Sequence, residues 1–267
     1  MGPIRILSVV IPVFNERRTI EELLRRVLHV ELTGVAKDIV IVDDGSTDGT
    51  TEWLRAFLNT QARTGTRSTS SHIEDIVISQ NVKVLFHAQN HGKGAALVRG
   101  FHEVSGDMIL VQDADLEYDP RDYADLIAPL CRDTADVVYG SRFLSRTTPA
   151  WTMAGYVGNK LVTAASNHMT GLSLTDVWTG YKVFKRSVIQ QIVLKESGFE
   201  LELELTSKVA YGGWRICEVP ITYQPRSRAD GKKITWKDGL KAMHCLFRYR
   251  RSKLLGQQSK VQKICNP

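Results

Sequence analysis

Short runs of apolar residues recur along the first part of the chain, and each is followed by polar or glycine-rich residues. These runs are short and rich in β-branched residues, which predicts buried strands at 6–13, 38–42, 82–86, 107–112 and 136–139. Between them, apolar positions recur at helical spacing in 19–28, 50–58, 94–104 and 121–130. Strands that alternate with helices predict an α/β fold, with a mostly parallel sheet and helices on both faces.

The second part of the chain is less regular. Residues 149–172 predict a helix or helix pair with one apolar face, and 176–193 predict a strand followed by a helix. Glu and Leu alternate in 200–205 as in a strand, but both residue types favour helix, so we predict a helix there. Residues 215–223 predict a strand at an edge of the sheet, because Pro220 has no N–H to donate.

The C-terminal region combines basic residues with apolar positions at helical spacing. The segment 235–253 therefore predicts a basic amphipathic helix that lies on a membrane surface, although a helix packed on the protein would show the same pattern. Its apolar positions are Leu240, Met243, Leu246 and Phe247. We expect one domain over 1–234, with a flexible Ser/Thr-rich insertion at 59–80, and a basic helix and tail over 235–267.

Composition limits the class of protein. The 267 residues are 43% hydrophobic and 24% charged, as expected for a globular protein of one large or two small domains. Basic residues concentrate in 226–263 and account for much of the net charge of +6, which suits nucleic acid, anionic lipid or phosphate ligands. The four cysteines are far apart, which argues against a zinc site and fits a reducing compartment. No apolar run reaches 18 residues, so we expect a cytoplasmic protein that meets a membrane only at its surface.

Acidic residues at the end of the fourth strand are the main candidates for chemistry. Asp113, Asp115 and Glu117 lie two residues apart, and in an extended segment such residues face the same side. Their oxygens would suit Mg²⁺ or Mn²⁺, which proteins commonly hold with one or two carboxylates and substrate phosphates. A solvated acidic turn before Pro120 is the simpler explanation of an isolated Asp-x-Asp.

The position of other polar loops favours the metal-site interpretation. In open α/β sheets, ligands bind at the carboxyl ends of the strands. Each of the five strands ends in polar or glycine-rich residues, so these loops should share one edge of the sheet. The loops are 14–16, 43–49, 90–94, 113–117 and 140–143.

Five motifs occur in an order that resembles a known family. They are Val10-Ile11-Pro12-Val13-Phe14-Asn15-Glu16, Val42-Asp43-Asp44-Gly45-Ser46, Asn90-x-Gly92-Lys93-Gly94, Asp113-Ala114-Asp115 and Gly140-Ser141-Arg142-Phe143. The sequence resembles inverting nucleotide-sugar glycosyltransferases of family 2, which have the GT-A (Rossmann-like) fold. Within the family it is most similar to polyprenyl-phosphate hexosyltransferases of the dolichyl-phosphate mannose synthase and glucosyltransferase type. The segment 231–239 matches the short bacterial members, and the resemblance covers about residues 6–245.

The resemblance implies a set of residues that bind the nucleotide sugar. They are Pro12, Phe14, Glu16, Val42, Asp43, Asp44, Lys93, Asp113, Ala114, Arg142, Arg226 and Lys232. In the family, residues matching Asp43 and Asp44 hold the base and ribose, and Phe14 matches a residue beside them. Arg142 matches a phosphate contact. Arg226 and Lys232 match a pair on a loop that closes over the diphosphate, where guanidinium and ammonium groups would stabilise the leaving group.

The implied catalytic residues are Asp113, Asp115, Arg142 and Asp176, with Asp115 and Glu117 as ligands of Mg²⁺ or Mn²⁺. The expected reaction transfers mannose or glucose from GDP-mannose or UDP-glucose to a polyprenyl phosphate at the cytoplasmic face of a membrane. A lipid phosphate is already ionised near neutral pH and requires no general base. A hydroxyl acceptor would require one, for which Asp176 is the best candidate, although Asp176 could equally orient Arg142 or cap the next helix. Many hydroxyl-directed relatives carry a Glu-Asp or Thr-Glu-Asp that is followed by a Gln-x-x-Arg-Trp stretch, and this sequence has no such stretch, which favours the lipid phosphate.

Two further classes of function fit single features of the sequence. The basic C-terminal region would also suit a non-catalytic module that binds nucleotides or nucleic acid. Its basic residues are not interleaved with aromatic residues in a recognisable RNA- or DNA-binding motif, so we expect no nucleic-acid partner. A phosphoryl-transferring nucleotidyltransferase would share carboxylates at strand ends, but the chain has no Gly-x-x-x-x-Gly-Lys-Ser/Thr loop.

Overall fold

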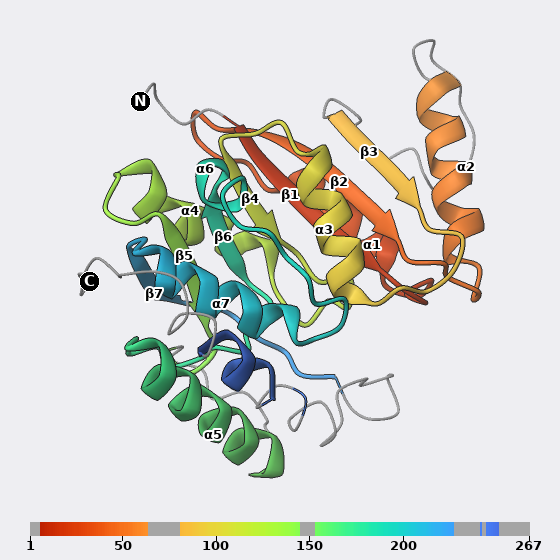
Figure 1. Ribbon diagram of the computed structural model, residues 1–267. Coiled ribbons are helices and arrows are strands. Elements are labelled where there is room, and N and C mark those ends of the chain that lie inside the picture. Colours follow the sequence, from red (N-terminus) through yellow and green to blue (C-terminus); the bar gives the residue numbers. More distant parts are fainter. Residues whose placement is uncertain (1–5, 64–80, 145–152, 227–240, 242–243, 251–267) are drawn as a thin grey trace.

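The structure is a computed structural model that describes residues 6–63, 81–144, 153–226, 241 and 244–250. A seven-stranded sheet crosses this part of the molecule in the order β3-β2-β1-β4-β6-β5-β7 (Figure 1). The strands are β1 (Ile6–Val13), β2 (Ala36–Asp43), β3 (Asn81–Phe86), β4 (Met108–Val111), β5 (Val137–Ser141), β6 (Lys182–Lys185) and β7 (Ile216–Pro220).

The sheet is mostly parallel, as predicted. Parallel pairing joins β1 to β2 and β4, β2 to β3, and β5 to β7. Strand β6 lies between β4 and β5 and runs antiparallel to both. The predicted edge strand is confirmed as β7, whose partner in the described sheet is β5.

Helices cover both faces of the sheet (Figure 1). One apolar core lies between the sheet and α1, α2 and α4, and a second lies between the opposite face and α3, α5 and α7. The helices are α1 (Ile20–His29), α2 (Thr50–Arg63), α3 (Lys93–Glu103), the short 3₁₀ turn η1 (Pro120–Asp122), α4 (Tyr123–Cys131), α5 (Met153–Thr170), α6 (Arg186–Ile189) and α7 (Leu201–Gly212).

The 200–205 segment is the N-terminal half of α7, so the helix prediction is confirmed. The alternation of Glu and Leu does not separate an exposed side from a buried one, because both types of side chain are buried. Leu203 and Leu205 enter the core, and Glu202 and Glu204 are buried with them. Residues 153–170 form one continuous helix, α5, rather than a pair.

Strand register brings the polar loops to one edge. Val13 lies opposite Asp43, and Asp43 lies opposite Phe86, so the residues that follow these three strands begin at the same level. Val10 pairs with Val111, which places Asp113 near this edge as well. The prediction that the loops after the parallel strands share one edge is therefore confirmed for β1, β2, β3 and β4.

Helix α2 extends into the start of the proposed insertion. Helix α2 continues to Arg63, so residues 59–63 are helical, in keeping with the helix-forming Gln61, Ala62 and Arg63. Residues 64–80 and the boundary at 234 lie outside the described residues.

Within the predicted C-terminal helix, residues 244–250 are helical. They bury Cys245, Leu246 and Tyr249 in the core that contains α7, while Phe247 is 52% exposed. This stretch thus packs on the protein, which is the second of the two arrangements that its pattern allows. None of the helices in the described part of the chain combines the length and apolarity needed to cross a bilayer.

Candidate active site

The loops after β1 and β2 hold each other in place. Asn15 adopts a left-handed backbone conformation, with φ of 54°, and its side-chain oxygen accepts a hydrogen bond from the Thr47 N–H at 2.8 Å. Its own N–H donates to the Ser46 hydroxyl at 2.9 Å. Asparagine tolerates this conformation better than most residues, because its short polar side chain can bond locally. Glu16 is thereby fixed at the edge of the sheet, with 7% of its surface exposed.

Asp43 and Asp44 are buried and brace the loops around the edge. Asp43 accepts hydrogen bonds from the Ser46 N–H and the Thr51 hydroxyl. Asp44 accepts the Gly92 N–H at 2.7 Å and the His91 N–H at 3.0 Å, and its Oδ1 lies 2.6 Å from Nδ1 of His87. Their predicted contacts with a base and ribose stay predictions. In the structure Asp43 connects β2 to the following loop and to α2, and Asp44 connects β2 to the start of α3.

The residues after β4 form a turn rather than an extended segment. Leu116 has φ of 62°, and the Glu117 N–H donates to Oδ1 of Asp115 at 3.1 Å. This local hydrogen bond offers the backbone an alternative to an extended conformation. The premise that Asp113, Asp115 and Glu117 share one side of an extended strand is therefore wrong, and each carboxylate has different partners.

Asp113 is held between a lysine and a glycine. Nζ of Lys93, at the first turn of α3, lies 2.7 Å from Oδ1 of Asp113. On the other side, a Cβ atom placed on Gly180 would lie 2.3 Å from Oδ2 of Asp113. The backbone of residue 180 can approach the carboxylate this closely only because it has no side chain.

Replacing Gly180 by alanine should displace the Asp113 carboxylate and lower kcat/KM by about tenfold or more, because small displacements at a reacting centre have large effects. Nucleoside-diphosphate release with a candidate sugar donor measures the effect, and circular dichroism checks the fold. Gly158→Ala is the matched control, because a Cβ atom on Gly158, in α5, would meet no atom of the surrounding structure within 4 Å. Unchanged kcat/KM in Gly180→Ala would contradict the requirement for this close approach.

Arg226 joins Glu16 to Asp115. Its guanidinium group contacts both oxygens of Glu16, at 3.1 and 3.0 Å, and lies 3.2 Å from Oδ2 of Asp115. Its backbone N–H donates to Glu117 at 2.7 Å, and the Tyr223 hydroxyl donates to the other oxygen of Glu117, also at 2.7 Å. The segment after β7 is thus attached to the loops after β1 and β4 through acidic side chains.

The environment of Asp115 disfavours a bare negative charge. Burial, followed by the charges of Asp113 and Glu117, raises the pKa of Asp115 to about 7, although Arg226 opposes the shift. Among the described residues, no three His, Cys, Asp or Glu side chains are grouped to hold a metal ion, so the three carboxylates do not form a complete cage. One or two carboxylates with substrate phosphates are the usual Mg²⁺ site, and Asp115 with Glu117 nearby fits that pattern.

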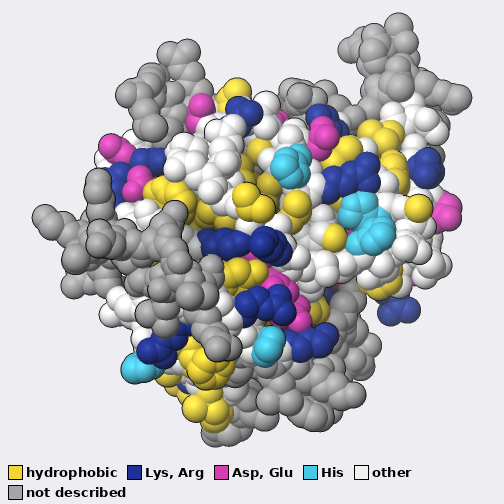
Figure 2. Space-filling model, viewed as in Figure 1, with side chains coloured by type: hydrophobic (Ala, Val, Ile, Leu, Met, Phe, Trp, Pro, Cys, Tyr) yellow, Lys and Arg dark blue, Asp and Glu magenta, His cyan; other side chains and the backbone are white. Residues whose placement is uncertain are grey.

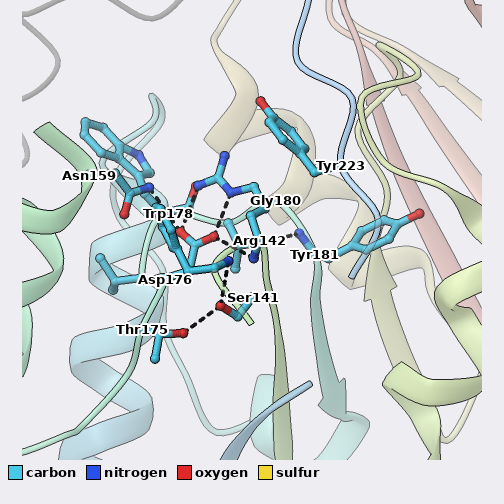
Figure 3. A network of polar contacts seen from close by, with 12 residues as sticks. Ser141, Arg142, Asn159, Thr175, Asp176, Trp178, Gly180, Tyr181 and Tyr223 are labelled. Atoms are coloured by element: carbon cyan, nitrogen blue, oxygen red, sulfur yellow. Dashed lines mark hydrogen bonds and ion pairs between the residues drawn. The ribbon is translucent and has the colours of Figure 1, made fainter. Parts of the chain in front are cut away.

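Arg142 and Asp176 form a buried ion pair (Figure 3). Nε and Nη2 of Arg142 donate to the two carboxylate oxygens at 2.7 and 2.8 Å, and its backbone N–H donates at 3.1 Å. Asn159 of α5 donates a fourth hydrogen bond to Asp176. Burial opposes ionisation of this fully buried carboxyl group, but the charge and hydrogen bonds of Arg142 outweigh it and lower its pKa. A carboxylate with these partners is suited to orienting Arg142 rather than to accepting a proton.

The guanidinium group of Arg142 is oriented by more than Asp176. It donates to the Trp178 carbonyl oxygen at 3.0 Å, and its central carbon lies 5.0 Å from the centre of the Tyr223 ring. Glu218 of β7 accepts the N–H groups of Thr175 and Asp176 at 2.7 and 3.0 Å and so fixes the turn that carries the carboxylate. Planar donors held this rigidly suit recognition of a phosphate.

The other predicted residues fall into three groups. Pro12 and Val42 are paired and buried, and Ala114 is also buried, so they shape the edge through their backbones. Phe14 is half-buried directly after β1. Lys232 lies outside the described residues.

Several residues at the site were not found from the sequence. His87 lies three residues before the Asn90 motif but outside it, and Tyr223 and Glu202 reach the site from elements far from the motifs. Gly180 matters because the absence of a side chain lets its backbone lie close to Asp113. A signal was present for Glu202, because acidic residues that alternate with leucines in a helix must have partners if they are buried.

The face of the described molecule that Figure 2 shows carries both signs of charge. In Figure 2, basic side chains lie beside acidic ones and apolar ones on the viewed face, without a single uninterrupted basic surface. The basic surplus of the sequence lies largely in 226–263, most of which falls outside the described residues.

Comparison with known proteins identifies the family. The model of the glycosyl transferase family 2 matches residues 8–193. The chain is 29% identical over 237 residues to the dolichol-phosphate mannosyltransferase of Pyrococcus furiosus, covering 85% of this chain and 58% of that protein. It is 31% identical over 192 residues to an undecaprenyl-phosphate 4-deoxy-4-formamido-L-arabinose transferase of Pseudomonas syringae, covering 72% of this chain and 50% of that protein. The chain thus spans less than two thirds of either relative.

Solved structures support the same fold. Glucosyl-3-phosphoglycerate synthase of Mycobacterium tuberculosis in complex with UDP superposes with a TM-score of 0.63, at 19% identity, over 92% of this chain and 80% of that one. The same enzyme with Mn²⁺, UDP-glucose and phosphoglyceric acid gives a TM-score of 0.63 at 18% identity and the same coverage. The α/β architecture is therefore of the GT-A type, and the chain belongs to glycosyl transferase family 2.

Proposed function

We propose that this protein transfers a hexose, with inversion, from a nucleotide-diphosphate sugar to a polyprenyl phosphate, and that the reaction requires Mg²⁺ or Mn²⁺. The names of two relatives, which specify dolichol phosphate and undecaprenyl phosphate, support the class of acceptor. Mannose from GDP-mannose and glucose from UDP-glucose are the proposed transfers.

The observation that carries the proposal is the arrangement of charges at the carboxyl edge of the sheet. Asp113 and Asp115 follow β4, while Lys93, Arg142 and Arg226 approach from three other elements. Carboxylates of the kind that bind a divalent cation, next to basic groups, suit a substrate whose leaving group is a diphosphate. A site that bound only a neutral sugar would need neither the carboxylates nor the basic groups.

The state of Asp176 supports a phosphate acceptor. A hydroxyl acceptor has to lose its proton to a base near the reacting carbon. Asp176 is the candidate base from the sequence, but it is fully buried and accepts four hydrogen bonds, three of them from Arg142. A polyprenyl phosphate brings an ionised oxygen, so it can attack without such a group.

The proposed reaction is a direct displacement. An oxygen of the lipid phosphate forms a bond to the anomeric carbon while the bond from that carbon to the diphosphate oxygen breaks, which inverts the anomeric configuration. Asp115, with Glu117 beside it, would hold the divalent cation, which when bound neutralises negative charge on the leaving diphosphate. Arg226 and Lys232 would contact the diphosphate, Asp113 would orient the nucleotide sugar, and Arg142 would bind phosphate.

The acceptor would be met at the cytoplasmic surface of a membrane. The basic residues of 226–263 support binding to anionic lipid. Helix α5, which contributes Asn159 beside Asp176, exposes Tyr156, Val157 and Leu161 to solvent, with Leu161 66% exposed. Clustered exposed apolar side chains are typical of contact surfaces.

A donor screen tests the proposal. Purified protein with Mn²⁺ or Mg²⁺ is supplied with GDP-mannose, UDP-glucose, UDP-galactose or UDP-GlcNAc and a short polyprenyl phosphate, and release of nucleoside diphosphate is followed. We expect release with one sugar donor that requires both the lipid phosphate and the metal. Release that requires only a hydroxyl acceptor would move the assignment to a glycan transferase. If none of the donors gives release of nucleoside diphosphate, and neither GDP nor UDP binds, the proposed function is refuted.

A further inference from the structure

A chain of four alternating charges runs from the interior of the protein to Asp113. Lys182, in β6, contacts Glu202 of α7, and the other oxygen of Glu202 lies 3.1 Å from Nζ of Lys93. The same Nζ lies 2.7 Å from Asp113. Lys182 is fully buried and Glu202 is 4% exposed, whereas Lys93 and Asp113 face the edge of the sheet.

Each charged group in this row is stabilised by its oppositely charged neighbours. A buried lysine is stable only with partners, and Lys182 has Glu202, the Thr179 carbonyl oxygen and the face of the Tyr139 ring, 4.8 Å away. Lys93 lies at the N-terminus of α3, where the helix dipole disfavours a positive charge. The two acidic groups hold it there, and the four charges sum to zero.

The proposed reaction gives Lys182 and Glu202 no direct part. Neither would touch the nucleotide sugar, because Lys93 and Asp113 lie between them and the edge. An apolar pair would fill the same core at less expense in desolvation. Their value would lie in fixing the ammonium group that contacts Asp113.

We propose that Glu202 and Lys182 are positioning residues for the nucleotide-sugar donor: they fix Lys93, which holds the Asp113 carboxylate in the orientation that receives the nucleotide. The inference rests on the proposed function, since it assumes that Asp113 contacts the donor.

The charge balance gives this proposal a distinctive signature. Glu202→Gln leaves two lysines around one carboxylate, and Lys182→Met leaves two carboxylates around one lysine. Either change leaves the row of charged side chains with a net charge and shifts the contact between Lys93 and Asp113. The double variant removes both inner charges and leaves Lys93 and Asp113 as a neutral pair, so it should bind the nucleotide better than either single variant.

Calorimetric titration with GDP and with UDP, each with Mn²⁺, measures the effect. We expect each single substitution to weaken binding of the preferred nucleoside diphosphate by about tenfold or more, and the double variant to recover much of that loss. Where turnover is measurable, KM for the sugar donor should rise while KM for the lipid phosphate stays within about twofold. Circular dichroism and thermal unfolding show whether each variant is folded.

Lys185→Met is the matched control. Lys185 lies in the same short strand as Lys182, but it pairs with Asp133 and Asp136 at the other end of the strand. Its loss should lower the unfolding temperature without changing nucleotide affinity. A role of Lys182 in stability alone predicts the same behaviour for both lysines.

The outcomes separate this inference from the proposed function. No nucleotide binding by the unaltered protein overturns both. If the unaltered protein binds the nucleotide, and Glu202→Gln and Lys182→Met bind it with the same affinity, only the inference is overturned. A double variant whose loss of nucleotide affinity equals the sum of the two single losses also overturns the inference. If one single variant does not fold, the double variant is compared with the unaltered protein, and its affinity has to lie within about tenfold of the unaltered value.

Discussion

Replacing Asp115 by alanine should reduce turnover by about a thousandfold or more while leaving the fold intact. The carboxylate is the proposed ligand of the divalent cation, and metal-based stabilisation of a leaving diphosphate is worth several kcal/mol. Stability should not fall, because Asp115 is buried beside Asp113 and Glu117, and its charge is disfavoured there. Nucleoside-diphosphate release gives the turnover and thermal unfolding gives the stability, both measured on the same preparation.

Asp125→Ala is the control for that experiment. Asp125 lies on the exposed surface of α4, within about ten residues of Asp115, and should be dispensable for turnover. Mn²⁺ binding in the presence of GDP or UDP, followed by electron paramagnetic resonance, should be weakened in Asp115→Ala alone. Full activity in Asp115→Ala would remove the metal assignment.

Replacing Asp176 by asparagine should destabilise the protein by about 3–5 kcal/mol, because it leaves the charge of Arg142 buried without its partner. Activity should fall with it, since the orientation of Arg142 is lost. Chemical denaturation measures the first effect and nucleoside-diphosphate release the second. Asp133→Asn is the control: its carboxylate is 74% exposed in a surface ion pair, so its replacement should change the stability far less.

The pH dependence distinguishes an ion pair from a base. The pKa of Asp176 is lowered on folding, so its stabilising contribution is complete above the unfolded value near 3.9 and is lost as pH falls through the lower folded value. The stability difference between the unaltered protein and Asp176→Asn should be constant from roughly pH 5 to 9 and shrink only below about pH 4. Native stability in Asp176→Asn, with turnover lost, would instead identify Asp176 as the base for a hydroxyl acceptor.

Most of the architecture could be predicted because each strand and helix has its own periodicity. The direction of β6 could not: residues 182–185 show only that a strand exists, whereas its antiparallel pairing depends on β4 and β5. The same limit applies to the turn at 113–117, where the left-handed Leu116 depends on a hydrogen bond between neighbouring residues.

The site could be predicted where a residue belongs to a local motif and not where it depends on distant partners. Asp113 and Asp115 follow directly from the strand that carries them. Lys182 begins the short strand β6, and the sequence gives no sign of its contact with Glu202, twenty residues later. The sequence offered Asp176 either as a base or as a residue that orients Arg142, and only the folded chain, in which the two side chains are paired, decides for the second role.

The insertion of β6 between β4 and β5 also has a consequence for synthesis on the ribosome. The partners of β5 in the described sheet are β6 and β7, both of which follow it in the chain. β5 ends at Ser141 and β6 begins at Lys182, about 40 residues later, or roughly two to eight seconds of translation. During that interval an apolar strand waits without its sheet neighbours while β1, β2, β3 and β4 can already pair. In the nascent protein β1, β2, β3 and β4 can therefore pair first, and β5 emerges before either of its sheet partners.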